Sequence, residues 1–332
     1  MPPHPSRRRF IRIAAAAAGL PLVPFGRNAR AEGRAVTWRG LALGAAAELR
    51  IHHPDRAVAE RAIARARAEV QRLERLFSLY RADSALVALN RTGIAAAPAP
   101  EMVDLLTRCR DHWALTDGAF DPSVQPLWAL YAAHFSRGDA DPAGPARDLL
   151  ADTLDTVGFS KVLVSRDRIA FARRGMALTL NGIAQGYITD RVVGLLRAEG
   201  LAHSLVDLGE CRTLDARPDG SAWAVGIADP DRPDRIGETV AIVDEAVATS
   251  GGYGFRFDAP GRFNHLLDPQ SGGSAGRYRS LTVVMPTATA ADALSTAFSL
   301  MPAERILAIL RRLRHGRVHV VDAGGARRVL AA

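Results

Sequence analysis

One stretch, residues 177–190, restricts the fold more than any other part of the chain. An apolar run predicts a strand over Met176–Leu180, and the pair Asn181-Gly182 then breaks that pattern. Over Tyr187–Glu199 the apolar residues recur at helical spacing, and Gly200 marks the end of the predicted helix. A strand, a glycine turn and a helix start can receive a phosphate, because the first N–H groups of a helix point at the anion. The alternative is an ordinary strand-to-helix turn, since the letters match neither the dinucleotide-binding nor the Walker A glycine pattern.

The composition indicates a folded chain with a nearly neutral body. The 332 residues are 48% hydrophobic and 23% charged, which is typical of a globular protein with a sizeable core. Of the 43 basic residues, six are arginines within the first 31 positions, so the rest of the chain holds 37 basic and 35 acidic residues. The sequence shows no basic stripe with interleaved aromatic residues, and we therefore expect no nucleic-acid partner.

The first 31 residues have the pattern of an export signal. Ser6–Ile11 carries paired arginines, an apolar run extends over Ile13–Val23, and Ala29–Ala31 has the A-x-A form of a signal-peptidase site. This pattern predicts a twin-arginine signal peptide over residues 1–31 and a single domain over residues 32–332. It predicts a periplasmic protein, or a membrane-associated one if the signal is retained. No other stretch is long and apolar enough to predict a transmembrane helix.

Helical and strand patterns follow one another irregularly along the rest of the chain. The hydrophobic periods predict helices over 55–77, 100–116, 187–199, 288–300 and 303–313, with Asp83 or Ser84 capping one more short helix. They predict strands over 35–43, 46–51, 162–171, 203–209, 222–227, 239–242, 246–249, 263–267, 281–285 and 318–321. Two prolines and a glycine predict a loop over 118–128. Because no regular βαβ repeat appears, the sequence predicts an α+β fold with mixed or antiparallel sheets and packed helices.

Asp292 and Thr296 form the strongest local pattern that could carry chemistry. They stand four apart on a predicted helix, so their oxygens lie on one face. A carboxylate and a hydroxyl suit a hard cation such as Mg2+, which prefers oxygen ligands. The alternative is structural, because an aspartate near a helix N-terminus interacts with the dipole and a threonine can bond back to a carbonyl.

Several turns combine polar side chains with glycine. His265 ends a predicted strand, where its imidazole can act as a general base or hydrogen-bond the turn backbone. Val247–Gly252 brings the Ser250 hydroxyl to a strand end, which suits a phosphate or a ribose, or simply a turn. Asp207–Glu210 and Gly118–Asp121 are similar carboxylate-and-glycine turns.

The two cysteines, Cys109 and Cys211, fit no metal-ligand spacing. Two are also too few for a disulfide framework. We expect free thiols in the core, with a single bridge as the alternative in an oxidising compartment.

Seven short motifs follow one another between residues 77 and 300. They are Phe77–Tyr80, Gly118–Pro122, Asn181–Tyr187, Leu205–Glu210, Ala248–Gly251, His265–Gly272 and Ala291–Thr296. In this order they resemble the ApbE family, the FAD:protein FMN transferases. The Asn181–Tyr187 version together with a twin-arginine start looks most like the branch that serves nitrous oxide reductase maturation. The resemblance implies an ApbE-like, T-fold-like α+β architecture.

The resemblance also implies a reaction and its partners. Members of the family bind FAD and Mg2+, cleave the FAD pyrophosphate and attach FMN by a phosphoester to a threonine of an acceptor protein, releasing AMP. The acceptor implied here is a periplasmic or membrane-bound electron-transfer flavoprotein. Two alternatives use the same site: an FAD pyrophosphatase that releases FMN and AMP to water, and a non-catalytic FAD-binding maturation scaffold.

The resemblance assigns roles to individual residues. The Asp292 and Thr296 side chains, with the Gly182 carbonyl, would hold Mg2+, and His265 would help deprotonate the acceptor threonine, so that His265 and Asp292 are the implied catalytic residues. Residues implied to contact or line the FAD site are Tyr80, Ala119, Phe120, Asp121, Thr179, Gln185, Ser250 and Leu267. Two of these depart from the family pattern, which often has Asp at the position of Thr179 and Lys or Glu at that of Gln185. Both departures remove charge near the pyrophosphate.

Overall fold

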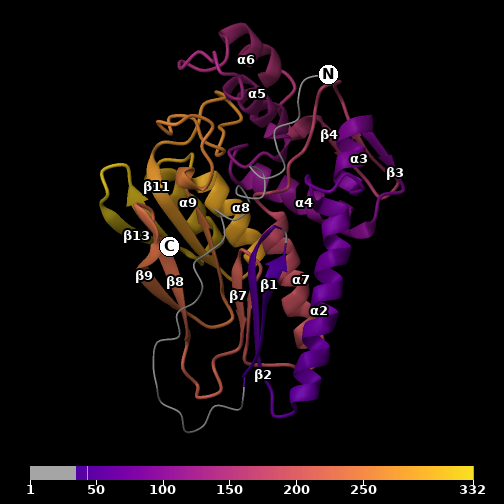
Figure 1. Ribbon diagram of the computed structural model, residues 1–332, viewed down its shortest axis with the longest axis vertical. Helices are drawn as coiled ribbons and strands as arrows, with labels where there is room; N and C mark the ends of the chain where they lie inside the picture. The colour runs from indigo at the N-terminus through magenta and orange to yellow at the C-terminus, as the bar shows by residue number, and fades with distance from the viewer. Residues whose placement is uncertain (1–34, 43, 332) are drawn as a thin grey trace.

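The computed structural model describes residues 35–42 and 44–331 (Figure 1). The predicted signal peptide, residues 1–31, lies outside the described residues. Within the described part of the chain, no helix combines the length and the apolar character needed to cross a membrane.

An antiparallel sheet of eight strands forms the centre of the fold (Figure 1). Its strands, in spatial order, are β1 (Ala35–Ala42), β2 (Ala45–His52), β6 (Ser204–Asp207), β7 (Cys211–Leu214), β10 (Ala246–Ser250), β11 (Tyr278–Met285), β12 (Arg317–Asp322) and β13 (Arg327–Ala331). The two strands predicted at the start of the domain are confirmed and pair as a hairpin, and β2 also pairs with β6, with Leu49 opposite Val206. The chain therefore leaves the large sheet after β2 and returns to it only at β6, with residues 53–203 between them.

Two smaller sheets accompany the large one. One consists of β3 (Ile94–Ala96), β5 (Arg168–Phe171) and β4 (Val162–Val164), and the other of β8 (Trp223–Asp229) and β9 (Arg232–Ile242). The β8–β9 hairpin packs its Trp223, Val225 and Ile227 against Leu205 and Val247 of the large sheet. Because side chains alternate along a strand, the residues next to Leu205 and Val247 point to the opposite face of the large sheet.

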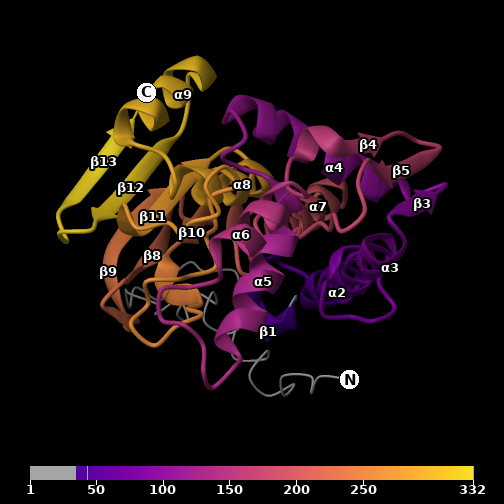
Figure 2. The same cartoon turned by 90° about the horizontal axis from the view of Figure 1, so that it is seen from above.

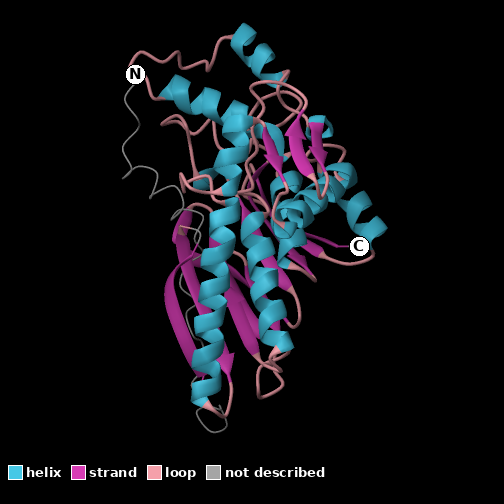
Figure 3. Ribbon diagram, turned by 90° about the vertical axis from the view of Figure 1, so that its right-hand side faces the viewer, coloured by secondary structure: helices cyan, strands magenta, loops and turns pink. Residues whose placement is uncertain are grey.

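Helices cover this opposite face of the large sheet. The described helices are α2 (Arg56–Phe77), α3 (Ala85–Thr92), α4 (Pro100–Leu115), α5 (Gln125–Phe135), α6 (Arg147–Leu154), α7 (Ala184–Ala198), α8 (Ala288–Phe298) and α9 (Ala303–Leu313). The long helices α2 and α7 run side by side along the sheet (Figure 3), while α9 lies beside β12 and β13 at the far edge (Figure 2). The α+β prediction is confirmed, and Ser84, rather than Asp83, caps α3 through its hydroxyl and the Val87 N–H at 3.1 Å.

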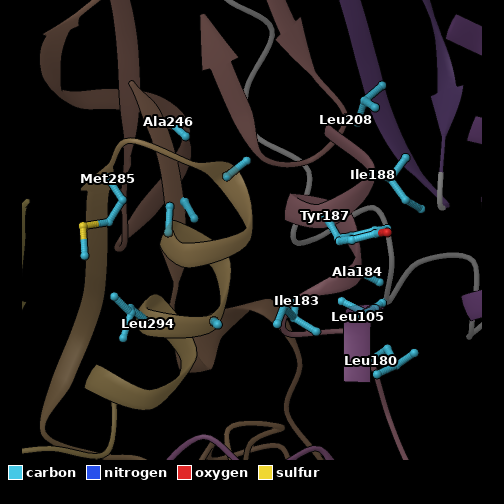
Figure 4. Close-up of a cluster of buried hydrophobic side chains, with 14 of the residues drawn as sticks. Leu105, Leu180, Ile183, Ala184, Tyr187, Ile188, Leu208, Ala246, Met285 and Leu294 are labelled. Carbon is cyan, nitrogen blue, oxygen red and sulfur yellow. The ribbon is translucent and has the colours of Figure 1, made fainter. Parts of the chain in front are cut away.

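The main core lies between the sheet and helices α2, α7 and α8. Figure 4 shows Tyr187 and Ile188 of α7 and Leu294 of α8 among its buried side chains. Helices α7 and α8 approach each other closely at Gly186, where an added Cβ would come within 2.2 Å of the Ala288 carbonyl oxygen. Only glycine permits this approach, which fixes the position of α8 against the start of α7.

The predicted loop over residues 118–128 is wrong in its second half. A 3-10 turn over Pro122–Val124 leads directly into α5, which begins at Gln125. Pro126 is compatible with this helix because the first-turn N–H groups have no partner within the helix. No helix or strand is predicted from the sequence at α6, β3, β7 or β13.

The predicted strand over Met176–Leu180 is wrong as well. The segment joins no sheet, because its backbone bonds to a side chain instead: Asn90 donates to the Leu178 carbonyl at 2.8 Å and accepts from the Leu178 N–H at 2.7 Å. The helix after it begins at Ala184, three residues earlier than predicted. The predicted strand over 263–267 is reduced to isolated bridges at Asn264 and Leu267.

Candidate functional site

A cavity of about 250 Å³ lies between the start of α7, α8, the β6–β7 turn and the loops that follow α4 and β10. It collects residues that are far apart in the sequence. All predicted site residues except Tyr80 line it, namely Ala119, Phe120, Asp121, Thr179, Gly182, Gln185, Ser250, His265, Leu267, Asp292 and Thr296. The cavity is therefore the candidate site.

Two aspartates join α7 and α8 in a reciprocal way. Asp190 of α7 accepts hydrogen bonds from the N–H groups of Ala288 (2.8 Å) and Thr289 (2.9 Å) at the start of α8. Asp292 of α8 accepts one from the Gly186 N–H (3.0 Å) in the first turn of α7. Each carboxylate satisfies N–H groups that have no partner within their own helix.

The rest of the Asp190 environment makes this residue structural. The Thr289 hydroxyl donates to it at 2.5 Å, and Arg212 of β7 forms an ion pair with it. Asp190 thus fixes where α8 begins, and through α8 it positions Asp292 and Thr296 at the cavity.

The Asp292 carboxylate is buried, with 4% of the residue exposed, and Gly186 is its one hydrogen-bond donor within the described chain. Burial raises the pKa of Asp292 to about 7, with the Asp190 charge adding to the increase and the Gly186 N–H opposing it. A carboxylate held in this way favours a bound cation, because a cation would restore the interactions that the carboxylate loses on leaving water.

Thr296 faces Gly182 across the cavity wall. A Cβ on Gly182 would lie 2.7 Å from the Thr296 hydroxyl oxygen, so the absence of a side chain allows the hydroxyl to approach the glycine backbone. The Thr296 hydroxyl makes no hydrogen bond with another described residue, and therefore does not bond back to its own helix as the structural alternative requires. Asp292, Thr296 and the backbone of Gly182 thus bring together oxygen atoms suited to a hard cation.

No described group of three or more His, Cys, Asp or Glu side chains is arranged to hold a metal. A cation in the cavity would therefore use hydroxyl and carbonyl oxygens in addition to carboxylates. This donor set is one that Mg2+ accepts and that zinc rarely uses.

The β6–β7 turn brings two more carboxylates to the cavity. The Asp207 carboxylate accepts from the Gly209 N–H at 3.1 Å, and Glu210 follows directly. Burial raises the pKa of Asp207 to about 6, and the Glu48 charge adds to this increase while the Gly209 N–H opposes it. Burial also raises the pKa of Glu210 well above its usual value, as do the charges of Asp292 and Asp207. Sequence reasoning noted this turn but gave neither carboxylate a role.

His265 forms part of the cavity wall and lies in a loop rather than at a strand end. Its Nδ1 and its backbone N–H both bond to the Phe255 carbonyl at 3.2 Å. Because a carbonyl only accepts, Nδ1 carries the proton and Nε2 is left as an acceptor. Burial lowers the pKa of His265, with the Phe255 hydrogen bond acting in the opposite direction, so the neutral form is favoured.

An aromatic cluster supports this wall. Trp128 of α5 lines the cavity and stacks on Phe255 with ring centroids 5.9 Å apart, and Phe257 packs edge-on against both rings. Tyr131 behind them donates to the Gly272 carbonyl at 2.9 Å. The cluster fixes the loop that carries His265.

The structure shows different surroundings for Tyr80 and Asp121. Tyr80 is 51% exposed and reaches the cavity only through Asn181, whose side-chain amide donates to the Tyr80 hydroxyl at 3.1 Å. Asp121 lines the cavity, but its carboxylate accepts from Ser123 (2.8 Å and 2.5 Å) and from the Phe159 N–H (2.9 Å). Its geometry is that of a structural cap, with little capacity left for a ligand. The assigned contacts of both residues with FAD stay predictions.

Hydroxyl and amide groups complete the lining. Ser250 and Ser295 share a hydrogen bond at 2.7 Å, and the Gln185 side chain donates to the Leu208 carbonyl at 3.3 Å. Thr179 is held by its N–H, which donates to the Pro122 carbonyl at 2.8 Å. Cys109 and Cys211 are both buried and free, as expected, and Cys211 lines the cavity.

Comparison with known proteins gives a consistent result. Residues 43–321 match the model of the ApbE family. The FAD:protein FMN transferase of Treponema pallidum is 33% identical over 269 residues, which cover 73% of this chain and 72% of the relative. The protein of the same name from Salmonella typhimurium is 30% identical, covering 71% of this chain and 70% of the relative.

Solved structures agree with the sequence comparisons. The apo form of the flavinyl transferase ApbE of Pseudomonas stutzeri superposes with a TM-score of 0.74 at 26% identity, covering 91% of this chain and 97% of that chain. The ApbE protein of Thermotoga maritima superposes with a TM-score of 0.74 at 28% identity, covering 89% of this chain and 96% of that chain. Because the family model covers most of the chain and the folds agree over nearly the whole of the solved structures, this chain belongs to the ApbE family.

Proposed function

We propose that this protein is an Mg2+-dependent FAD:protein FMN transferase, which attaches FMN to a threonine of an acceptor protein and releases AMP. The observation that carries the proposal is the α7–α8 wall, where Asp292 and Thr296 present oxygen atoms beside the backbone of Gly182 in a family whose curated relatives bear this name.

The residues present fit an Mg2+ ion. Asp292 uses one carboxylate oxygen for the Gly186 N–H, which leaves the other for a cation, and Thr296 and the Gly182 carbonyl add neutral oxygens. When bound, Mg2+ neutralises negative charge on the FAD pyrophosphate and on the leaving phosphate.

The chain's own groups account for the proton transfer. In our proposal the neutral Nε2 of His265 accepts the proton of the acceptor threonine hydroxyl. The threonine oxygen then bonds to the phosphorus of the FMN half as that phosphorus loses its bond to the bridging oxygen of the pyrophosphate. AMP leaves with this oxygen and its electron pair, and the imidazolium returns its proton to solvent or to the product.

We also propose where the reaction takes place. The twin-arginine pattern of residues 1–31 supports export to the periplasm, with membrane association if the signal is retained. The acceptor is then a periplasmic or membrane-bound electron-transfer flavoprotein, and the Asn181–Tyr187 motif supports the branch associated with nitrous oxide reductase maturation.

Incubation of the protein with FAD, MgCl2 and candidate acceptors tests the proposal. The acceptor should gain the mass of one esterified FMN and become a fluorescent band on a denaturing gel, and replacement of its threonine by alanine should abolish both signals. A chelator should stop the reaction. AMP release that is unchanged when the acceptor is omitted would instead indicate a pyrophosphatase, and FAD binding without AMP release would indicate a scaffold.

The role of His265 as the general base has its own test. Because burial lowers the pKa of His265, the imidazole stays neutral until the pH falls below its ordinary value of about 6.5. The rate of FMN transfer should therefore decline only on the acid side of that value, and His265→Gln should be slow and have lost that decline. A His265→Gln variant that keeps the wild-type pH profile would remove His265 from the mechanism.

A further inference from the structure

The Glu210 backbone is fixed from two directions. Within the β6–β7 turn, the Leu208 N–H donates to the Glu210 carbonyl at 3.3 Å, and from α7 the Thr189 hydroxyl donates to the same carbonyl at 3.2 Å. Gln185, one turn earlier on α7, holds the neighbouring Leu208 carbonyl. The turn is thus attached to the helix that also supplies Gly186, and the Glu210 side chain starts from a defined point beside the α7–α8 wall.

The Glu210 side chain has no partner in the described chain. The residue is 9% exposed and lines the cavity, yet its carboxylate forms no hydrogen bond and no ion pair with any described residue. Glu48, with 7% exposed, shows the usual solution, since Arg39 and Arg50 bond to its two oxygens at 2.8 Å and 2.6 Å. A buried carboxylate without such partners destabilises the fold by several kcal/mol unless something else balances its charge.

The cavity offers no protein cation that could balance it. Among the described residues that line it, none is a lysine or an arginine, and His265 is held in its neutral form. The nearby Arg212 is engaged with Asp190. Asp292 lines the same cavity as Glu210. Two carboxyl groups with no basic side chain beside them offer an anionic pyrophosphate no positive charge, so the pyrophosphate needs a cation supplied from solution.

We propose that Glu210 is a further metal ligand, so that its carboxylate and that of Asp292 hold one divalent cation between the β6–β7 turn and α8. The inference rests on the cation site of the proposed function and extends it with a residue from a different element. Two carboxylates balance the charge of one divalent ion, and the neutral oxygens of Thr296 and Gly182 remain available to it.

Titration of the apo protein with MgCl2 or MnCl2 in a calorimeter, without FAD, tests the proposal. Glu210→Gln keeps the size of the side chain and removes its charge, and it should weaken Mg2+ binding by at least about tenfold. Glu210→Asp keeps a carboxylate on a shorter side chain and should recover part of the affinity. Asp207→Asn is the matched control, because Asp207 lines the same cavity but already has the Gly209 N–H as a donor. It removes a nearby charge without removing a ligand, so it should weaken Mg2+ binding clearly less than Glu210→Gln does.

Thermal unfolding gives a second readout that needs no activity. In a chelator, Glu210→Gln should unfold at a higher temperature than the wild type, because it no longer buries a charge without a partner. In excess MgCl2 the order should reverse, since the wild type gains more from the bound ion.

The outcomes separate this inference from the proposed function. If Asp292→Asn loses Mg2+ binding while Glu210→Gln retains wild-type affinity, Glu210 is not a ligand and the cation site of the proposed function stands without it. If both variants retain wild-type affinity, the cation site itself is wrong and both proposals fail.

Discussion

Asp190 and Asp292 occupy matching places on α7 and α8, and their surroundings differ. Asp190 receives hydrogen bonds from two backbone N–H groups and a hydroxyl and forms an ion pair with Arg212. Asp292 receives one hydrogen bond and borders a cavity without basic side chains. The same residue type is therefore structural where donors surround it, and suited to ligand chemistry where they are missing. The number of donors separates the two roles, although Asp292 is also the more buried of the two.

The largest effect is expected at Asp292, the aspartate with few hydrogen-bond donors. Asp292→Asn removes the negative charge but keeps an oxygen for the Gly186 N–H. We expect the rate of FMN transfer to fall by about a thousandfold, or about 4 kcal/mol of transition-state stabilisation.

The melting temperature of Asp292→Asn in a chelator should not decrease, because the burial that raises the pKa of Asp292 to about 7 opposes its charged form. Steady-state kinetics and calorimetry check the pair of results. A variant that loses stability together with activity would show that Asp292 is structural in the way Asp190 is.

The next effect tests Asp190. Asp190→Ala leaves Arg212 and the first N–H groups of α8 without their acceptor, and we expect unfolding to become easier by about 3 kcal/mol. Asp190→Asn should recover part of that loss by accepting from the backbone again.

The denaturant midpoint measures the stability of both Asp190 variants. Activity per folded molecule should fall less than in Asp292→Asn, since Asp190 does not line the cavity. An Asp190→Ala protein with wild-type stability would contradict the positioning role.

Two glycines of α7 test how closely this helix must approach α8. Gly186→Ala would place a Cβ 2.2 Å from the Ala288 carbonyl oxygen, and should reduce stability by about 2–3 kcal/mol. Gly194, in the same helix, has open space around it, so Gly194→Ala should raise stability by about 0.5–1 kcal/mol. Urea unfolding measures the change in the free energy of unfolding for both variants. If both changes had the same sign, α7 and α8 could separate without penalty.

The last effect, which vanishes at low pH, concerns the pH dependence of Asp207. Its pKa is raised to about 6 in the folded protein, so the folded state binds the proton more tightly than the unfolded state does. Stability is therefore lost as the pH rises from about 4 to about 6, and Asp207→Asn avoids that loss. Because the carboxyl is partly exposed, we expect a gain of about 2 kcal/mol above pH 6 and none below pH 4. Denaturant midpoints of the wild type and of Asp207→Asn should be measured in a chelator across this pH range. If the two stabilities changed with pH in parallel, the raised pKa of Asp207 would be rejected.

Local patterns predicted the parts of the fold that depend on near neighbours. The faces of α2 and α8, the cap of α3 and the spacing of Asp292 and Thr296 all arise within a few residues, and the structure has each of them. Residues 176–180 carry a strand pattern, but Asn90 occupies the backbone groups that a neighbouring strand would use. A side chain 88 positions away decided that outcome, and no local pattern contains it.

The candidate site shows the same limit. Asp190 acts on residues almost 100 positions later in the chain, and Glu210 becomes unusual only when its surroundings lack a donor. Both depend on which segments meet, and the sequence alone does not place them. Pro126 was misread for a different reason, because a proline at the start of a helix looks like a loop signal when the helix that follows has a weak apolar face.

The pairing of β2 with β6 has a consequence for the order of events during synthesis. The β1–β2 hairpin is complete once residue 52 has been made, but the strand that covers its inner edge follows only after about 150 further residues. At ordinary ribosome speeds this takes on the order of 10 s, during which the backbone edge of β2 has no neighbour. A nascent chain of this protein therefore carries an open strand edge for nearly half of its elongation, and residues 56–200 must collapse beside that edge without blocking it.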